Sequence, residues 1–361
     1  MYFEIRNMLM IKLNEQIEHI KFILKIKMKL VTFIEENDEQ YLGIILDDKI
    51  VNLFLAGQSY CELSGGADDF MKLENLASIN DFLFGGDEAK EFLNKVLSWM
   101  ENHQDETSEL SKPISEVELL APIPHPTSMR DGYAFRQHVE AARRNRGVEM
   151  IPEFDLFPIF YFTNHNAVTG PGEVEVMPLH LDKLDFELEC AIVIGKEGRN
   201  IKAEDADDYV FGYTIMNDWS ARTIQFEEMK MSLGPAKGKD FATSIGPYIL
   251  TRDEMIEKRI PSEKGERYDL TMVTRVNGTE VSRGNLKDMT WTFAQIIERA
   301  SYGTTLYPGD VIGSGTVGTG CFLELNGSKI TDNWWLKPGD VVECEIDLLG
   351  NLKNEIFLDS V

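Results

Sequence analysis

The sequence predicts an α+β protein rich in β-strands, in which a mixed β-sheet barrel or roll with a few helices follows a small α+β domain. Short β-branched and aromatic runs recur along the second part of the chain and are separated by Gly, Asn or Pro. RVNGTE and ELNGSK each place Asn-Gly between two such runs, which is a strong hairpin signal. YPGD and KPGD are each expected to form a turn before a strand. Strands do not alternate with helices as they do in parallel βαβ proteins.

Residues 1–27 carry charges every few positions and contain neither a long apolar span nor a small-residue cleavage site. The sequence therefore predicts neither a membrane helix nor a signal peptide here. Strand-like sequence begins afresh at Met28. Residues 1–27 are either an upstream extension from a misassigned start or an amphipathic helix, and both interpretations remain open.

Residues 28–110 are predicted to form the small N-terminal α+β domain, with two strands around a polar turn in MKLVTFIEENDEQYLGIILDDKIVNL. DEAKEFLNKVLSWME predicts a helix with Asp87 as its N-cap. The apolar face of this helix consists of Phe92, Val96, Leu97 and Met100. ENHQDETSELSKP is polar and acidic and is interpreted as a linker. The β-rich domain is expected to cover residues 115–361.

The composition restricts the partners of this protein. The chain has 361 residues, 43% of them hydrophobic, and a formal net charge of −25. So acidic a chain is not expected to bind nucleic acid or an anionic membrane, but it suits the binding of a cation. The cysteines form no CxxC pair, which argues against a zinc ribbon and predicts a reducing cytoplasmic location. They are Cys61, Cys190, Cys321 and Cys344, of which the second and fourth lie in apolar strand-like runs.

Acidic residues alternate in KLDFELECAIVIG, just where a strand enters an apolar run. Asp185, Glu187 and Glu189 therefore share one face of the strand. Glu187 and Glu189 are placed to hold one cation between them, although a solvated strand face would give the same pattern. In MNDWSARTIQ, Asp218 follows a strand and precedes a helix, where an N-cap is the simplest interpretation.

DGYAFRQH places His138 seven residues after Asp131, which is predicted to open a helix. That spacing is about two turns, so both side chains would lie on one side, although a lone helical histidine is usually structural. GSGTVG, residues 313–318, matches the GxGxxG pattern of dinucleotide sites. Such a site needs a helix directly after the motif, and a hairpin is predicted here instead, so nucleotide binding is rejected. Glycines in this loop would rather let the backbone approach a ligand.

Four stretches, DGYAFRQH, DFELE, MNDWSARTIQ and GKDFATSIGP, resemble the fumarylacetoacetate hydrolase family in this order, over about residues 115–361. The resemblance implies the mixed β-roll of the family's C-terminal type, a homodimer, and a site at one mouth of the roll. It also implies a divalent metal, and oxygen ligands favour Mg²⁺ or Ca²⁺, with Mn²⁺ as a further candidate. The implied ligands are Asp131, Glu187, Glu189 and Asp218. Asp185 would be an outer neighbour or a solvated bystander.

The resemblance further implies that His138 is a base that activates water, and that Glu324 orients it. Without the resemblance, Glu324 would be interpreted as an exposed strand residue. Lys239 matches a lysine that would stabilise a developing oxyanion. The implied substrate contacts are Tyr161, Gln225, Thr316 and Arg146, with Arg143 and Arg144 as alternatives to Arg146.

The resemblance, together with the presence of these residues, implies a metal-dependent hydrolase that cleaves a carbon–carbon bond in a small 1,3-diketo acid resembling fumarylacetoacetate or an acylpyruvate. The metal would polarise a carbonyl group of the substrate. The alternative is a 2-keto acid decarboxylase, isomerase or hydratase on the same metal scaffold, since the ligands alone do not separate these reactions. A non-catalytic small-molecule binding protein is a third alternative, disfavoured because every implied site residue is present.

Overall fold

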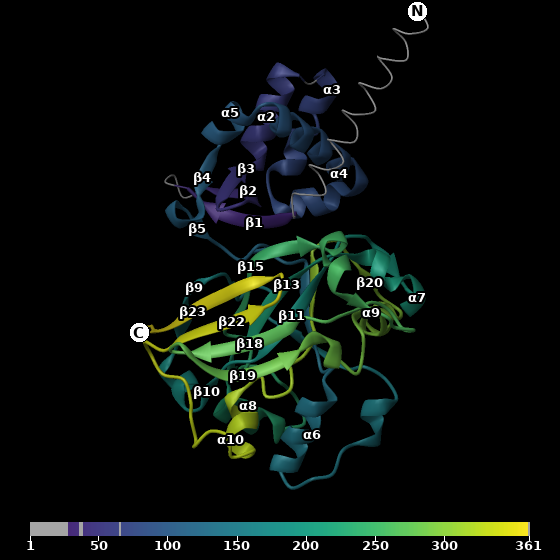
Figure 1. Ribbon diagram of the computed structural model, residues 1–361. Helices are drawn as coiled ribbons and strands as arrows, with labels where there is room; N and C mark the ends of the chain where they lie inside the picture. The colour runs from purple at the N-terminus through teal and green to yellow at the C-terminus, as the bar shows by residue number, and fades with distance from the viewer. Residues whose placement is uncertain (1–27, 36–38, 65, 360–361) are drawn as a thin grey trace, which may run out of the picture.

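The computed structural model describes residues 28–35, 39–64 and 66–359. Both interpretations of residues 1–27 concern a segment outside these described residues. Figure 1 shows a smaller N-terminal unit, coloured purple to blue, above a larger β-rich unit that contains most of the strands. The predicted fold class, α+β with a large mixed sheet, is confirmed.

The main sheet has 12 strands and joins the two predicted domains. Its order is β4-β3-β2-β1-β15-β13-β11-β21-β6-β7, with β5 beside β1 and β8 beside β15. The strands are β1 (Lys29–Ile34), β2 (Gln40–Leu46), β3 (Lys49–Asn52), β4 (Ser111–Pro113), β5 (Glu118–Leu119), β6 (Ser128–Gly132), β7 (Phe160–Thr163), β8 (Val168–Thr169), β11 (Leu188–Ile194), β13 (Val210–Asp218), β15 (Thr243–Thr251) and β21 (Asp310–Gly313). Because β1 pairs antiparallel with β15, the sheet continues from the smaller unit into the larger one. The domain boundary near residues 110–115 stays a prediction.

A five-stranded sheet with the order β19-β18-β22-β23-β9 lies over the main sheet and completes the roll. Its strands are β9 (Gly172–Val176), β18 (Thr271–Val276), β19 (Thr279–Asn285), β22 (Val341–Ile346) and β23 (Gly350–Leu358). Three strand pairs stand apart: β10 (Leu184–Asp185) with β14 (Ser220–Ala221), β12 (Gly198–Arg199) with β20 (Thr305–Leu306), and β16 (Arg259–Ile260) with β17 (Arg267–Tyr268).

The position of β11 explains why its sequence is apolar without interruption. Cys190 and Ile192 point into the core that also contains Leu352 of β23, between the two sheets. Ala191 and Val193 point to the opposite face, into a core formed with the helices of the N-terminal unit. A strand buried on both faces needs no polar alternation.

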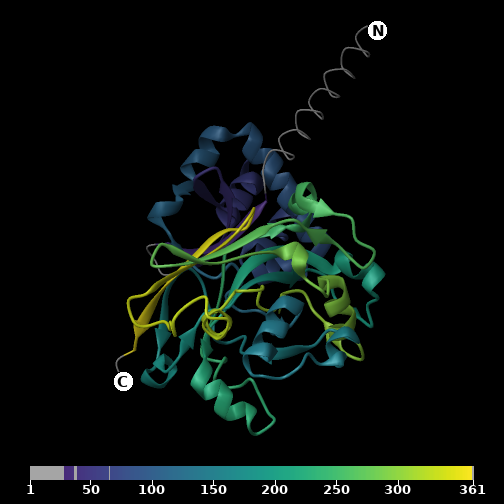
Figure 2. The same ribbon diagram turned by 60° about the horizontal axis from the view of Figure 1, so that its bottom comes forward.

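The α-helices cover the ends and the outer faces of the sheets (Figures 1 and 2). They are α2 (Leu53–Leu63), α3 (Ala67–Phe70), α4 (Ile79–Asn102), α5 (Gln104–Glu109), α6 (Arg136–Asn145), α7 (Ala203–Ala206), α8 (Arg222–Met229), α9 (Phe293–Ser301) and α10 (Phe322–Gly327). Helices α6, α8 and α10 lie together at the end of the larger unit that faces away from the N-terminal unit. This end holds the candidate site.

The predicted helix after residue 86 is longer than expected. Helix α4 begins at Ile79, and its N-cap is Ser78, whose side chain accepts a hydrogen bond from the backbone of Asp81 at 3.1 Å. Asp87 is therefore not the N-cap of the whole helix. It follows a kink at Gly86, where φ is 55°. The predicted apolar face is confirmed, because Phe92, Val96, Leu97 and Met100 are all buried.

Three further expectations about local structure are wrong. The predicted linker after residue 100 contains the end of α4, α5 and β4. Asp131 does not open a helix but lies on β6, and α6 begins five residues later. ELNGSK is not a hairpin, because its first residues form α10.

A short helix therefore does follow GSGTVG. The loop is still not interpreted as a nucleotide site, because the backbone N–H of Gly315 donates to buried carboxylates instead.

The other turn predictions hold. In RVNGTE, Asn277 and Gly278 have φ of 51° and 76° and join β18 to β19. In KPGD, the side chain of Asp340 accepts a hydrogen bond from the backbone of Lys337 at 3.0 Å, directly before β22. Asp310 of YPGD makes the equivalent bond to the backbone of Tyr307 at 2.9 Å, directly before β21.

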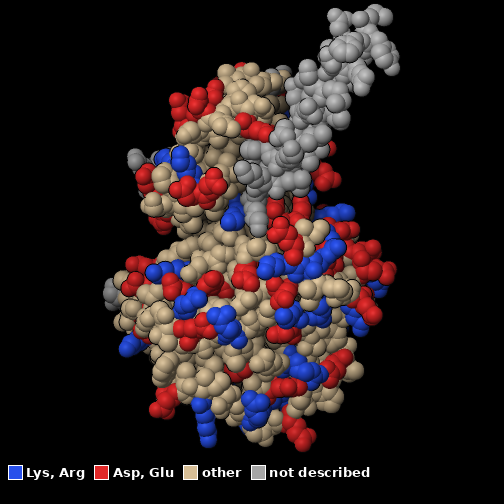
Figure 3. Space-filling view, viewed as in Figure 1, with Lys and Arg blue, Asp and Glu red and all other residues tan. Residues whose placement is uncertain are grey.

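Lys and Arg side chains are interspersed with Asp and Glu on the face of the larger unit that Figure 3 shows. The expectation that this acidic chain does not bind nucleic acid stays a prediction. Within the described residues, the structure contains no helix whose length and apolarity would let it cross a membrane.

Candidate active site

Three strands within one four-strand stretch of the main sheet, β13-β11-β21-β6, bring four carboxylates together at one end of the roll. Asp131 lies on β6, Glu189 on β11 and Asp218 at the end of β13, while Glu187 directly precedes β11. One oxygen atom of each lies within 4.8 Å of the others, and all four side chains are buried. We call this group the carboxylate cluster. The resemblance implied these four residues as ligands of one metal, and the structure brings all four together.

Glycines at the end of β21 and in the loop after it make room for the carboxylate cluster. A Cβ atom at Gly313 would lie only 2.7 Å from Oδ1 of Asp131 and 2.9 Å from Oε2 of Glu189. Gly315, whose φ is 80°, donates its backbone N–H to the same two oxygens at 3.1 and 2.9 Å. The GSGTVG motif is therefore glycine-rich because its backbone packs directly against carboxylates, where a side chain would not fit.

Burial and mutual repulsion set the charges in the cluster. Burial raises the pKa of Asp131 to about 7 and the pKa of Glu189 well above its usual value. Burial also raises the pKa of Asp218, despite the neighbouring lysine. Burial opposes the ionisation of Glu187 as well, but Lys239 and Arg222 together hold its pKa below the usual value. Full ionisation of all four groups therefore requires additional positive charge.

The residues of the cluster fit a divalent cation. All four donors are carboxylate oxygens, which Mg²⁺ and Ca²⁺ prefer. Oδ1 of Asp218 is buried and has no hydrogen-bond partner, so one acceptor in the cluster is free for a ligand. An unsatisfied buried carboxylate oxygen is costly unless a cation or a water molecule occupies the space beside it.

Lys239 and Tyr161, which the resemblance implied as site residues, contact the cluster directly. The ammonium group of Lys239 contacts a carboxylate oxygen of Glu187 and lies 2.6 Å from Oδ2 of Asp218. Tyr161 donates its hydroxyl to the same Asp218 oxygen at 2.5 Å. Lys239 is buried, and these carboxylates outweigh desolvation to raise its pKa, so it stays charged.

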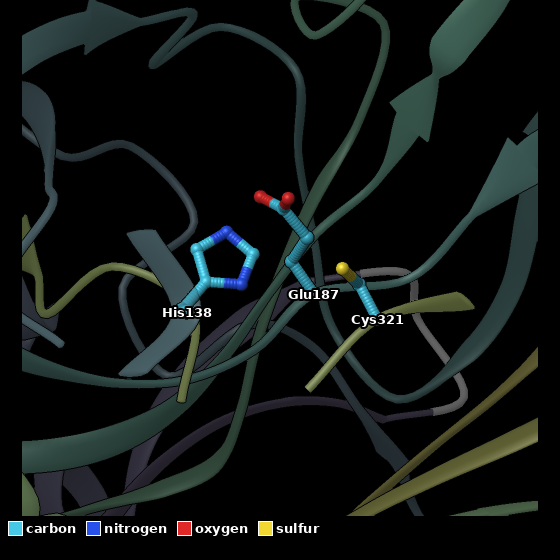
Figure 4. A group of neighbouring side chains, drawn as sticks. All are labelled: His138, Glu187 and Cys321. Carbon is cyan, nitrogen blue, oxygen red and sulfur yellow. The ribbon is translucent and has the colours of Figure 1, made fainter. Parts of the chain in front are cut away.

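His138 forms a buried pair with Glu324, as the resemblance implied. Nδ1 of His138, in the first turn of α6, lies 2.8 Å from Oε2 of Glu324 on α10. Glu324 is 3% exposed, so the alternative of an exposed strand residue is wrong. A ring nitrogen of His138 lies within 4.8 Å of a Glu187 oxygen, and the two side chains point toward each other in Figure 4. The imidazole therefore adjoins the carboxylate cluster.

Asp185 holds α10, and through it Glu324, in place. Its carboxylate accepts hydrogen bonds from the backbone of Phe322 at 2.7 Å and of Leu323 at 2.9 Å, at the start of α10. Asp185 is fully buried, so the alternative of a solvated bystander is wrong. It is an outer neighbour of the carboxylate cluster, and it contacts the helix that carries Glu324, the partner of His138.

Arg222 is a site residue that the sequence analysis missed. Its side chain is 2% exposed and joins Oδ2 of Asp185 at 2.8 Å to Oε1 of Glu187 at 2.7 Å. Its position directly after the MNDWSA segment was the only signal in the sequence. Tyr133 was also missed, and its ring packs edge-on against the imidazole of His138, with centroids 5.8 Å apart.

Replacing Arg222 with glutamine is expected to lower the free energy of unfolding by about 3–5 kcal/mol, because buried Asp185 loses the guanidinium beside it and buried Glu187 keeps Lys239 but loses Arg222. Urea denaturation without metal would measure the change. Arg283→Gln is the matched control, since its partner Glu280 is exposed and a surface pair contributes about 0–1 kcal/mol. A loss below about 1 kcal/mol for Arg222→Gln would show that the buried contacts do not hold the site.

The remaining predicted substrate contacts lie at different distances from the cluster. Oγ1 of Thr316 lies 3.5 Å from Glu189, and Gln225 accepts a hydrogen bond from Arg222 at 3.1 Å. Arg146 is exposed at the C-terminal cap of α6, where it donates to the backbone of α6.

The alternatives to Arg146 are engaged elsewhere. Arg143 donates to the backbone of Glu149, and Arg144 lies 3.4 Å from Oγ of Ser328. The structure therefore brings Thr316 and Gln225 to the site. Which arginine would bind a substrate carboxylate stays a prediction.

Comparisons with known proteins agree with this geometry. A family model described as the fumarylacetoacetate (FAA) hydrolase C-terminal domain matches residues 127–357. Oxaloacetate tautomerase YisK of Bacillus subtilis is 32% identical over 329 residues, which cover 88% of this chain and 97% of that protein. The mitochondrial oxaloacetate tautomerase FAHD2A of Homo sapiens is 32% identical over 246 residues, or 68% of this chain and 71% of that protein.

A similar solved structure is the fumarylacetoacetate hydrolase of the psychrophile Exiguobacterium antarcticum, with a TM-score of 0.64 and 23% sequence identity. The match covers 92% of this chain and 100% of that structure. At this level of identity the likeness establishes the fold alone.

Proposed function

The chain belongs to the fumarylacetoacetate hydrolase family, and we propose that it is a metal-dependent enzyme that interconverts the keto and enol forms of a small 2-oxo acid. One observation carries this proposal: the buried His138–Glu324 pair adjoins a carboxylate cluster that fits a divalent cation. Proton transfer at the carbon next to a carbonyl group needs a base of this kind beside a positive charge.

His138 is the proposed base. Its Nδ1–H donates to Glu324, which leaves Nε2 free to accept a proton from the substrate carbon. Glu324 fixes this tautomer and stabilises the imidazolium, which then returns the proton. The Lys239 ammonium stabilises the negative charge that develops on the substrate oxygen. A divalent cation bound at the carboxylate cluster would supply polarisation of the keto oxygen.

Keto–enol tautomerisation makes the fewest demands on the site. It needs one base and one polarising charge, and it breaks no bond between heavy atoms. The relatives from Bacillus subtilis and Homo sapiens are named oxaloacetate tautomerases, which supports a 2-oxo dicarboxylic acid similar to oxaloacetate as the substrate.

The hydrolysis of a 1,3-diketo acid, which the sequence analysis favoured, is the second candidate. The His138–Glu324 pair favours it, because a buried histidine oriented by a carboxylate is also suited to activating water. Hydrolysis would additionally require a water molecule beside Nε2 and a route for protonating the leaving carbon.

The test is to add the enol form of oxaloacetate to Mg²⁺-loaded protein and follow the loss of enol absorbance, with products identified by NMR. The proposal expects faster loss than in buffer, conservation of mass, and abolition by EDTA. A panel of acylpyruvates run in parallel tests the second candidate, which expects two fragments from each molecule. Release of CO₂ from oxaloacetate would instead support decarboxylation. If no substrate reacts with folded, metal-loaded protein, both candidates are wrong.

A further inference from the structure

A second group of metal-binding side chains lies beside the carboxylate cluster. A ring nitrogen of His138, a carboxylate oxygen of Glu187 and the sulfur of Cys321 lie within 4.8 Å of one another, and all three residues are buried. Figure 4 shows the imidazole, the carboxylate and the thiol close together, although they come from α6, the segment before β11 and the residue before α10.

The imidazole is oriented as in a metal ligand. Nδ1 of His138 is held by Glu324 at 2.8 Å, which leaves Nε2 available. Histidines that bind metals usually donate their other ring N–H to a carboxylate in this way, which fixes the ring and raises the basicity of the free nitrogen. The pair that makes His138 a base therefore also prepares it to bind a cation.

The three donors differ in kind from those of the carboxylate cluster. One nitrogen, one oxygen and one sulfur suit Zn²⁺, which is usually bound by Cys, His and carboxylate side chains. Mg²⁺ and Ca²⁺ prefer oxygen donors and bind thiolates poorly. The two groups share only Glu187, whose carboxylate also contacts Arg222 and Lys239. The structure therefore offers a hard-cation site and, beside it, a soft-cation site.

We propose that His138, Glu187 and Cys321 form a binding site for Zn²⁺ and that Zn²⁺ bound there inhibits the enzyme. Binding replaces the thiol proton of Cys321, which is released to solvent, and forms a bond between the thiolate and the metal. Without a soft cation, burial raises the pKa of Cys321 well above its usual value, so the thiol stays protonated. The bound cation occupies Nε2 of His138, which then accepts no proton from a substrate. The inhibition, unlike the binding, rests on the proposed function of His138.

Cobalt spectroscopy tests the binding without any measurement of activity. The full chain, saturated with Mg²⁺, is titrated with Co²⁺, which shows a near-ultraviolet charge-transfer band when a thiolate binds it. The proposal expects this band in the wild type and in Cys344→Ser, another buried cysteine whose partner is Thr274. It expects no band in Cys321→Ser or Cys321→Ala. Absence of the band from folded wild-type protein would overturn the site.

Zinc titrations test the affinity and the inhibition. Calorimetry should show at least about tenfold weaker Zn²⁺ binding in Cys321→Ser than in the wild type. Zn²⁺ should inhibit the Mg²⁺-loaded wild type. With each rate expressed relative to the same protein without Zn²⁺, Cys321→Ser should require at least about tenfold more Zn²⁺ for half-inhibition. Equal Zn²⁺ affinity in the two proteins would refute the proposal. If the wild type turns over no 2-oxo acid, the proposed function fails, while the cobalt spectrum still decides whether the zinc site exists.

Discussion

Replacing His138 with alanine is expected to lower kcat by about 10²–10⁴-fold on whichever 2-oxo acid the protein converts. The reason is that His138 supplies the nitrogen that Glu324 orients beside the carboxylate cluster. The four cluster residues do not include His138, so metal binding should survive. Steady-state rates measured with saturating Mg²⁺ would give the loss in kcat, and thermal unfolding with and without Mg²⁺ would show that binding is intact.

Two controls separate loss of the base from general damage. His125→Ala removes an exposed histidine and should leave kcat unchanged. Glu324→Gln keeps the size of the partner but removes its charge, and should lower kcat by less than removal of the imidazole itself. Full turnover by His138→Ala would show that another group accepts the proton.

Local patterns predicted those parts of the fold that depend on local interactions. The Asn-Gly turn of RVNGTE works because Asn277 and Gly278 adopt positive φ with a strand on either side. ELNGSK has the same turn residues, yet its chain forms α10. The difference is a contact with Asp185, which binds the backbone N–H of Phe322 from 137 residues away in the sequence. The local sequence pattern does not reveal a contact between residues so far apart in the chain.

In the candidate site too, some residues are predictable from local geometry, and the roles of others depend on contacts between distant segments. The alternation of Glu187 and Glu189 showed that they share a strand face, because strand geometry alone determines that. The roles of Gly313 and Arg222 depend on which strands are neighbours. Gly313 pairs in the sheet with Asp131, and Arg222 reaches back to the segment before β11. The resemblance supplied the ligand set, but only the fold shows why an arginine and two glycines accompany it.

Replacing Glu189 with glutamine is expected to have opposite effects with and without metal. In EDTA, the variant should unfold at the same temperature as the wild type or higher, because Glu189 is buried against Asp131 and its pKa is already raised. Glutamine keeps an acceptor for the N–H of Gly315 but cannot repel the neighbouring carboxylate. With Mg²⁺ at about 100 times the wild-type Kd, the wild type should gain about 2.7 kcal/mol of stability and the variant almost none.

Thermal unfolding in EDTA and in Mg²⁺ measures both effects in one experiment, and activity should fall together with the metal-dependent shift. Glu197→Gln, the same change at an exposed position just after β11, is the control and should retain the full Mg²⁺ shift. If Glu189→Gln also retains it, Glu189 is not a ligand. A variant that is less stable in EDTA would mean that Glu189 contributes its carboxylate to folding rather than to the cation. The sign of the change without metal therefore distinguishes a residue kept for packing from one kept for binding.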